Sequence, residues 1–120
     1  MQPDGYTVSS LDELGEGYGF RKIRAPLGIT AFGANAVVLP PGFASHKHLH
    51  DEQEELYFVH SGSVVFTLDG AEHLIEAGGM VRVAPATVRG FRNPSETEDA
   101  VYLAIGGKDG YVGRDAHVVE

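Results

Sequence analysis

The 120-residue chain contains no cysteine, and its basic side chains are few. Without cysteine it can form neither a disulfide nor a thiolate metal site. Nine lysines and arginines stand against seventeen aspartates and glutamates, which gives a formal net charge of −8 at pH 7. This balance argues against nucleic acid or an anionic membrane as a partner, because phosphate-rich surfaces bind basic proteins.

Long apolar runs are also missing. No stretch approaches the roughly 18 apolar residues that a membrane span needs. The first residues, "MQPDGYTVSSLDELGEG", show neither the basic start nor the apolar segment of a secretory signal. Apolar residues still make up 42% of the chain and charged residues 22%, the balance of a globular domain. We therefore expect a soluble, cytoplasmic protein folded around one hydrophobic core.

Glycine is abundant, and with proline it divides the chain into short segments. Sixteen glycines and six prolines separate runs of about 5 to 8 residues rich in Val, Ile, Phe, Thr and Tyr, a pattern typical of an all-β sandwich or barrel. Asp69-Gly70 suits a tight hairpin turn with positive φ. A short helical turn is expected over Ser10–Leu14, capped by Ser10. The expected strands are Phe20–Ile23, Thr30–Leu39, Phe43–His48, Glu55–His60, Ser63–Leu68, Glu72–Ile75, Met80–Val83, Arg89–Arg92 and Ala100–Ile105.

Several expected strands are apolar on both faces. In Glu55–His60, "ELYFVH", the odd-numbered residues share one face and the even-numbered residues share the other. A sheet with one wet side would alternate more cleanly. We therefore expect one face to line the interior and the other to be covered by a second sheet or a partner subunit, and we expect a homodimer.

Half of the six histidines stand in one short stretch, "SHKHLHDEQEE". In a strand, His46, His48 and His50 project to one side at spacings of about 6.5 to 7 Å. Glu55 begins the next apolar run after a polar bend, so its carboxylate can return to the same side. Imidazole and carboxylate ligands suit Fe, Mn, Co, Ni, Cu or Zn without selecting among them. The stretch predicts a site for a divalent transition metal; a histidine-rich polar loop and a metal-free polar pocket are the alternatives.

The spacing in this region resembles the first motif of the cupin family. That motif has a glycine, five residues, His-x-His, four residues, a glutamate, six residues and a glycine. The sequence keeps every spacing, and the matching positions are Gly42, His48, His50, Glu55 and Gly62.

A second segment, "GGMVRVAPATVRGFRNPS", is similar to the second cupin motif, although it is altered. It keeps Gly79, Pro85 and Asn93, but the histidine that the family places four residues before the asparagine is Arg89 here. The resemblance extends from about residue 35 to residue 107. It implies a jelly-roll β-barrel, often dimeric, with a metal inside on His48, His50 and Glu55.

Arg89 changes what the site can do, because a guanidinium stays charged and does not ligate a metal. An inward Arg89 can clamp an anionic group of a substrate beside a facial triad of two histidines and one carboxylate. It can instead pair with Glu55 in a barrel without metal, or lie at the rim with its head in water. His46 is a candidate to replace the missing fourth ligand, and Tyr57 is expected beside the site.

These observations give an expected organisation and function. Residues 1–34 form an N-terminal arm with the first strands, 35–107 the barrel core and 108–120 a C-terminal tail, all in one domain. We expect a metal-dependent enzyme, similar to a dioxygenase, that acts on a small and anionic organic molecule, with Tyr57 and Arg89 in catalytic roles. The alternatives are a metal-free barrel that binds or senses a small molecule, and a sugar isomerase, an epimerase or a lyase.

Overall fold

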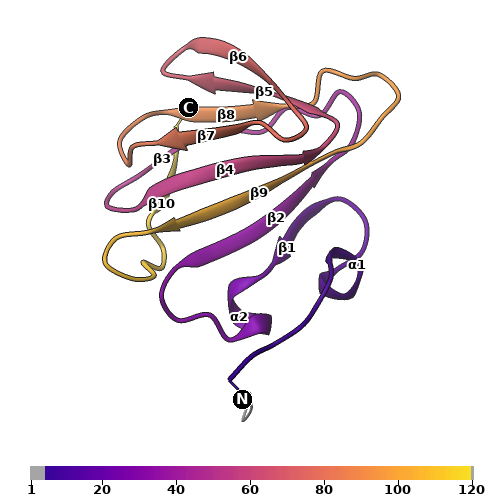
Figure 1. Cartoon of the computed structure of the whole chain (residues 1–120). Coiled ribbons are helices and arrows are strands. Elements are labelled where there is room, and N and C mark those ends of the chain that lie inside the picture. Colours follow the sequence, from indigo (N-terminus) through magenta and orange to yellow (C-terminus); the bar gives the residue numbers. More distant parts are fainter. Residues whose placement is uncertain (1–4, 120) are drawn as a thin grey trace.

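Two five-stranded antiparallel sheets build the protein (Figure 1). The structure, a computed structural model, describes residues 5–119. The first sheet has the order β1-β2-β9-β4-β7 and the second has the order β10-β3-β8-β5-β6. The elements are α1 (Leu11–Leu14), β1 (Gly19–Lys22), α2 (Arg24–Leu27), β2 (Gly33–Leu39), β3 (Lys47–His50), β4 (Glu54–Ser61), β5 (Ser63–Leu68), β6 (Ala71–Glu76), β7 (Met80–Val83), β8 (Arg89–Arg92), β9 (Ala100–Gly107) and β10 (Ala116–Val119).

The chain crosses between the two sheets at almost every connection. Strands β2, β4, β7 and β9 lie in the first sheet, and β3, β5, β6, β8 and β10 lie in the second. This alternation wraps one layer over the other, so the inward faces of both sheets enclose a single interior. The all-β, jelly-roll architecture predicted from the sequence is confirmed.

Two local predictions follow from side-chain chemistry and are confirmed. The Ser10 hydroxyl accepts a hydrogen bond from the Glu13 amide at 3.2 Å and so caps the single turn Leu11–Leu14. Asp69 and Gly70 both adopt positive φ, 47° and 87°, between β5 and β6. That conformation matches the right-handed twist of the two strands it joins.

The third expected strand, Phe43–His48, is wrong in its position. The regular strand is β3, Lys47–His50, which begins four residues later. Before it, the Phe91 amide donates to the Ser45 hydroxyl at 2.9 Å instead of to a main-chain carbonyl. The main chain still pairs with the β8 segment at the Ala44–Arg92 bridge, but the register shifts before His48 pairs with Arg89, so the regular strand begins only at Lys47.

Two elements were not expected from the sequence. Helix α2 is one turn, Arg24–Leu27, and tolerates Pro26 because the first turn needs no amide donor. Strand β10, Ala116–Val119, is short and mostly exposed, and its antiparallel pairing with β3 holds it in the second sheet. In residues 5–119, no helix has the length and apolar character to cross a membrane.

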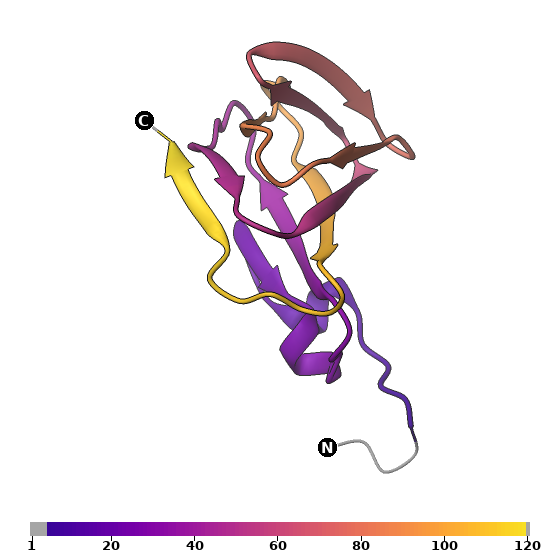
Figure 2. The same cartoon turned by 90° about the vertical axis from the view of Figure 1, so that its left-hand side faces the viewer.

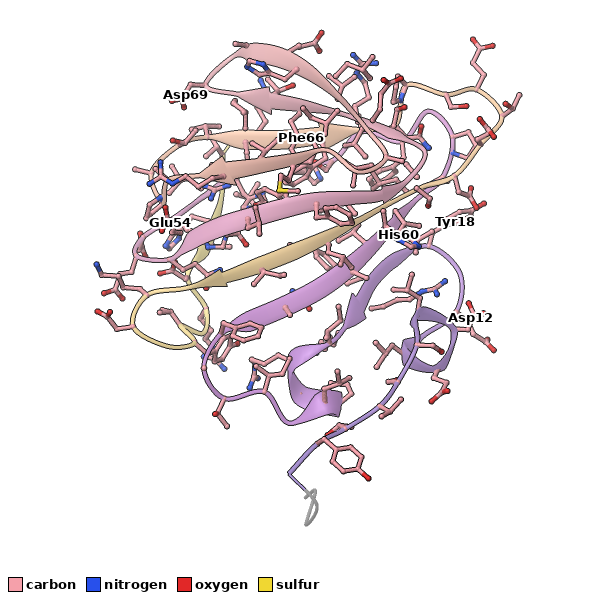
Figure 3. All side chains as sticks on the ribbon, viewed as in Figure 1. Asp12, Tyr18, Glu54, His60, Phe66 and Asp69 are labelled. Carbon is pink, nitrogen blue, oxygen red and sulfur yellow. The ribbon has the colours of Figure 1, made fainter. Side chains whose placement is uncertain are left out.

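An aromatic cluster fills the middle of the interior. Tyr57, Phe66, Phe91 and Tyr102 come from four strands of both sheets, and their ring centroids lie 4.9 to 6.0 Å apart. Phe66 is fully buried, whereas the labelled acidic residues lie at the periphery (Figure 3). Aromatic pairs at these separations contribute about 0.5–1.5 kcal/mol each beyond their area burial. This cluster fills one part of the barrel interior.

The two faces of β4 differ as the alternation predicted. Glu55, Tyr57 and Val59 are buried, whereas Leu56 and His60 are exposed. The odd-numbered residues therefore line the interior. On the outward face, Leu56 is 39% exposed and Phe58 is half-buried.

The interior is open between the two edge strands β1 and β10, which belong to different sheets and do not pair with each other. Phe20 on β1 lies opposite the buried Val37, and Val118 on β10 lies opposite His48, so both point inward. They are nevertheless 74% and 66% exposed. In Figure 2, the segment that connects β9 to β10 crosses the barrel beside this opening.

Candidate metal centre and adjoining cavities

Three potential metal ligands converge inside the barrel. Strand β3 supplies His48 and His50, and β4 supplies Glu55; one ligand atom from each lies within 4.8 Å of the others. His50 Nε2 lies 3.0 Å from Glu55 Oε1. Two donors bound at right angles to one ion at about 2.1 Å each would stand roughly 3.0 Å apart. The spacing of His50 and Glu55 therefore fits neighbouring ligands of a single transition-metal ion.

The bend between β3 and β4 is fixed by hydrogen bonds to distant parts of the chain. The His50 amide donates to the Pro85 carbonyl at 2.8 Å and ends the strand. The amides of Glu52 and Gln53 then donate to the Asp115 carboxylate. These contacts turn the chain so that Glu55 faces the same side as the two histidines.

Glu55 is held as a carboxylate. Its Oε1 accepts a hydrogen bond from the Tyr57 hydroxyl and lies 3.3 Å from a terminal nitrogen of Arg89. Burial opposes its ionisation, but His50, Tyr57 and Arg89 outweigh that effect and hold the pKa of Glu55 below its ordinary value. An ionised carboxylate is the form that binds a metal.

His48 is held in the neutral form. Burial, followed by the nearby His50 and Arg89, lowers the pKa of His48 to about 4. The rings of His48 and His50 meet edge to face with centroids 5.2 Å apart. A neutral imidazole keeps a lone pair for a metal, so the electrostatics of both His48 and Glu55 suit ligation.

Arg89 is fully buried, so the rim position does not occur. Its NH1 group donates to the carbonyls of Pro85 and Thr87 at 2.8 and 2.6 Å, and its Nε donates to the Tyr57 hydroxyl at 3.3 Å. With NH2 directed at Glu55, the protein itself occupies all but one of the five N–H groups. The structure therefore shows the pairing of Arg89 with Glu55 that was one of the expected arrangements, and the bidentate clamp on a substrate is not available in it.

The hydroxyl of Tyr57 is also directed at Glu55. Burial raises the pKa of Tyr57, and the neighbouring Glu55 carboxylate raises it further. The side chain stays a phenol near neutral pH and donates its proton to Glu55. Tyr57 and Arg89 are thus brought to the site as predicted, where they orient Glu55.

Asp115 is a site residue that the sequence did not reveal. Its Oδ2 lies 3.3 Å from His50 Nδ1, an ion-pair distance without a formed hydrogen bond, on the side of the ring opposite Glu55. Its carboxylate accepts two backbone amides in the β3–β4 bend. Such a carboxylate behind a ligating histidine fixes the orientation of the ring. Asp115 is 62 residues from Gln53 in the chain, and no local pattern connects the two.

His46 is not brought to the other ligands. It is exposed and lies outside the group of His48, His50 and Glu55. The expected alternation fails at this residue because regular β3 begins only at Lys47. His60 and His73 are exposed, and His117 pairs with Asp51 at the surface.

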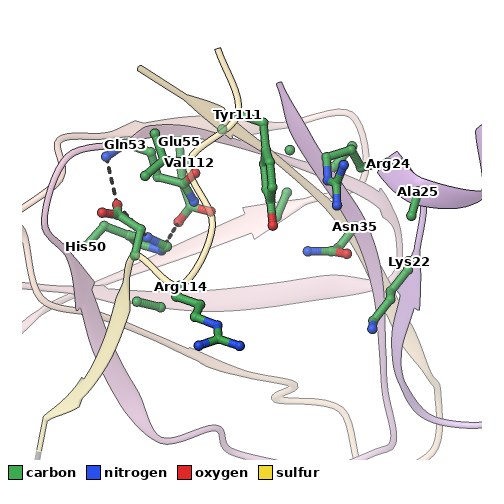
Figure 4. A pocket seen from close by; sticks show the side chains of 16 residues that line it. Lys22, Arg24, Ala25, Asn35, His50, Gln53, Glu55, Tyr111, Val112 and Arg114 are labelled. Carbon is green, nitrogen blue, oxygen red and sulfur yellow. Dashed lines mark hydrogen bonds and ion pairs between the residues drawn. The ribbon is translucent and has the colours of Figure 1, made fainter. Parts of the chain in front are cut away.

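Two cavities border the three ligands. The first, which we call the polar cavity, has a volume of about 350 Å³ and includes His50 and Glu55 (Figure 4). Its other polar lining residues are Lys22, Arg24, Asn35, Gln53, Tyr111, Arg114 and Asp115.

The second, which we call the apolar groove, has a volume of about 560 Å³ and includes His48. Its lining is mainly aromatic and aliphatic, with Phe20, Phe43, Phe91 and Val118 among its residues. The candidate metal centre therefore lies between a polar and an apolar region of one interior.

Comparisons with known proteins identify the family. The model of the cupin domain matches residues 35–106, more than half of the chain, and the chain belongs to the cupin family. A search of curated proteins gives no significant match.

Solved structures share the fold. A sugar phosphate isomerase of the cupin superfamily from Silicibacter pomeroyi is 26% identical, with a TM-score of 0.70 over 84% of this chain. The match covers 64% of that protein, so the chain spans less than two thirds of its length. A cupin protein from Bacteroides fragilis is 25% identical with a TM-score of 0.75, and 98% of both chains is covered. A DMSP lyase from Ruegeria pomeroyi is 20% identical with a TM-score of 0.64, over 74% of this chain and 43% of that one.

Proposed function

We propose that this cupin is a metal-dependent enzyme that acts on a small organic substrate in the polar cavity. The observation that carries the proposal is the convergence of His48, His50 and Glu55 beside a cavity large enough for a small molecule. A bound divalent ion with open positions would polarise a substrate oxygen or activate dioxygen.

Oxidation of the dioxygenase type is the chemistry that this donor set favours. Two histidines and one carboxylate form the facial triad associated with non-haem iron oxygenases. Arg89 occupies the position of a fourth protein ligand without being able to ligate, which leaves positions for substrate and oxygen.

The surrounding residues would keep the triad ready for an ion. Tyr57 and Arg89 hold Glu55 ionised and oriented, and Asp115 fixes the outer side of the His50 ring. Fixed ligands lose little conformational entropy when they bind a metal. The polar cavity would bring the substrate to one side of the three ligands.

Metal analysis of the purified protein tests this proposal. After treatment with a chelator, the chain is reconstituted separately with iron, manganese, nickel, cobalt, copper and zinc, and bound metal is measured by mass spectrometry. We expect about one ion per chain for at least one metal, since one triad forms one site. Less than about 0.2 ion per chain with every metal would reject the proposal and favour a metal-free binding barrel.

Isomerisation of a sugar phosphate is a second candidate. It is favoured by the basic residues in the polar cavity and by the 26% identical sugar phosphate isomerase. Oxygen consumption by the iron-loaded protein separates the two, because isomerisation consumes none. Fold alone does not decide between them.

A homodimer and a cytoplasmic location remain predictions. Sedimentation at several protein concentrations tests the first. The metal-free alternative is tested by thermal unfolding with organic acids in the presence of a chelator, because a ligand that binds the folded state raises the midpoint without an ion.

A further inference from the structure

The positively charged side chains of this acidic protein are not evenly neutralised. Four of the six arginines pair with a carboxylate: Arg21 with Asp12, Arg82 with Glu54, Arg89 with Glu55 and Arg92 with Glu72. Within residues 5–119, no carboxylate makes an ion pair with Arg24 or Arg114. Both line the polar cavity, together with Lys22, which also has no carboxylate partner in this part of the chain.

The three cations come from separate elements and line the same cavity. Lys22 ends β1, Arg24 begins α2, and Arg114 lies in the segment that leads to β10. In Figure 4, Lys22 and Arg24 stand on the side of the cavity away from His50 and Glu55, with Asn35 beside them. Arg114 stands between these two groups in the same view, so the cations extend from the far side of the cavity toward the ligands.

Arg24 is held in place without losing its charge. Its guanidinium carbon lies 3.8 Å from the centroid of the Tyr111 ring, the arrangement of a cation–π contact. Stacking of this kind uses the face of the guanidinium and leaves its N–H edge for planar recognition of oxyanions.

The acidic residues of the cavity do not cancel this charge. Among the lining residues within 5–119, only Glu55 and Asp115 carry carboxylates, and both lie beside the ligands. Glu55 is engaged by His50, Tyr57 and Arg89, and Asp115 accepts the amides of the β3–β4 bend.

We propose that Lys22, Arg24 and Arg114 form a subsite for the phosphate monoester group of the substrate. The inference deepens the proposed function and rests on it for the statement that this ligand is a substrate. A phosphate monoester carries close to two negative charges at neutral pH, whereas a carboxylate carries one. A ligand with a phosphate group therefore suits three cations better than a ligand with one carboxylate group does. A cavity of about 350 Å³ accommodates a small phosphorylated molecule whose other end reaches the triad.

The test measures binding of inorganic phosphate to the whole chain in the metal-free state, by calorimetry and by phosphorus NMR, at low ionic strength. The variants Arg24→Gln, Arg114→Gln and Lys22→Met are compared with the controls Arg82→Gln and Lys108→Met, whose side chains lie outside the polar cavity. We expect saturable binding that each cavity variant weakens about tenfold, the effect of one charge-assisted hydrogen bond, and that each control changes less than about twofold.

Three results would overturn the subsite: no saturable phosphate binding by the unaltered chain, equal weakening by the control variants, or binding of succinate as tight as that of phosphate. Thermal unfolding of each variant shows that it is folded. Phosphate binding is measured without metal, so the chain can bind phosphate and fail to bind a metal, or bind a metal and fail to bind phosphate. The failure of one proposal is therefore distinguishable from the failure of the other.

Discussion

The polar cavity and the apolar groove reach the same three ligands from different sides. His50 and Glu55 border the cavity, whereas His48 borders the groove. The cavity carries cations that have no carboxylate partner within residues 5–119, and the groove carries exposed aromatic and aliphatic side chains, Phe20 and Val118 among them.

The boundary between the two regions follows a step of two residues along β1 and β3. On β1 the inward residue changes from Phe20 in the groove to Lys22 in the cavity, and on β3 it changes from His48 to His50. On β10, Val118 lines only the groove, whereas Ala116 lines both regions. Because alternate residues of a strand share a face, one step of two residues suffices to divide one interior into two environments.

The largest effect is expected at Arg89, which is fully buried and pairs with the ligand Glu55. Arg89→Met leaves the Glu55 carboxylate buried without its cation, and removing one partner of a buried ion pair costs about 3–5 kcal/mol. Denaturant unfolding should show this loss. Arg92→Met, which breaks an exposed pair with Glu72, should cost less than about 1 kcal/mol. Similar losses in the two variants would contradict the central position of Arg89.

The next effect tests whether the two regions share one ion. Glu55→Gln removes a ligand on the cavity side and His48→Ala removes one on the groove side. Each should weaken metal binding more than about 100-fold, since even residues behind the ligands cost 10–100-fold. Competition with a coloured chelator measures the affinity. His46→Ala is the control and should leave it unchanged; a loss confined to one of the two ligand variants would mean that the triad does not act as a unit.

A smaller effect is expected at Asp115, which contacts only the cavity-side histidine. Asp115→Asn keeps the size of the side chain but removes the charge near His50 Nδ1, and we expect metal affinity to fall about 10–100-fold. Asp51→Asn, which alters an exposed pair with His117, is the matched control. If both variants bind metal equally well, Asp115 serves only the chain bend.

The smallest effect is expected in the apolar groove. Phe20→Ser and Val118→Ser alter side chains that are mostly exposed, and each should change the free energy of unfolding by less than about 0.5 kcal/mol. Metal affinity should stay the same. An unfolding midpoint that rises with protein concentration, and that these variants lower, would instead show that a second copy of the chain covers the groove.

The sequence predicted the parts of the site that lie close together along the chain. His48, His50 and Glu55 fall within one strand, one bend and the start of the next strand, so the periodicity of a strand and one reversal are enough to bring them together. Arg89 was recognised because the second motif gives its position. The partners that bind its guanidinium were not predictable, because they come from carbonyls in an irregular turn.

The failures concern contacts between distant or irregular segments. His46 matched the alternation of its neighbours, but it lies where the register shifts between the Ala44–Arg92 bridge and β3, outside the regular strand. Asp115 reaches the site only because β10 pairs with β3, and four mostly exposed residues give little signal for such a strand.

By itself, the sequence determined an all-β chain with a histidine and glutamate centre, because strand periodicity and turn chemistry are local properties. The tertiary structure alone decided that Arg89 supports Glu55, that Asp115 stands behind His50, and that Lys22, Arg24 and Arg114 line one cavity. These side chains lie far apart along the chain, and only the closure of two sheets over a common interior brings them within reach of one another.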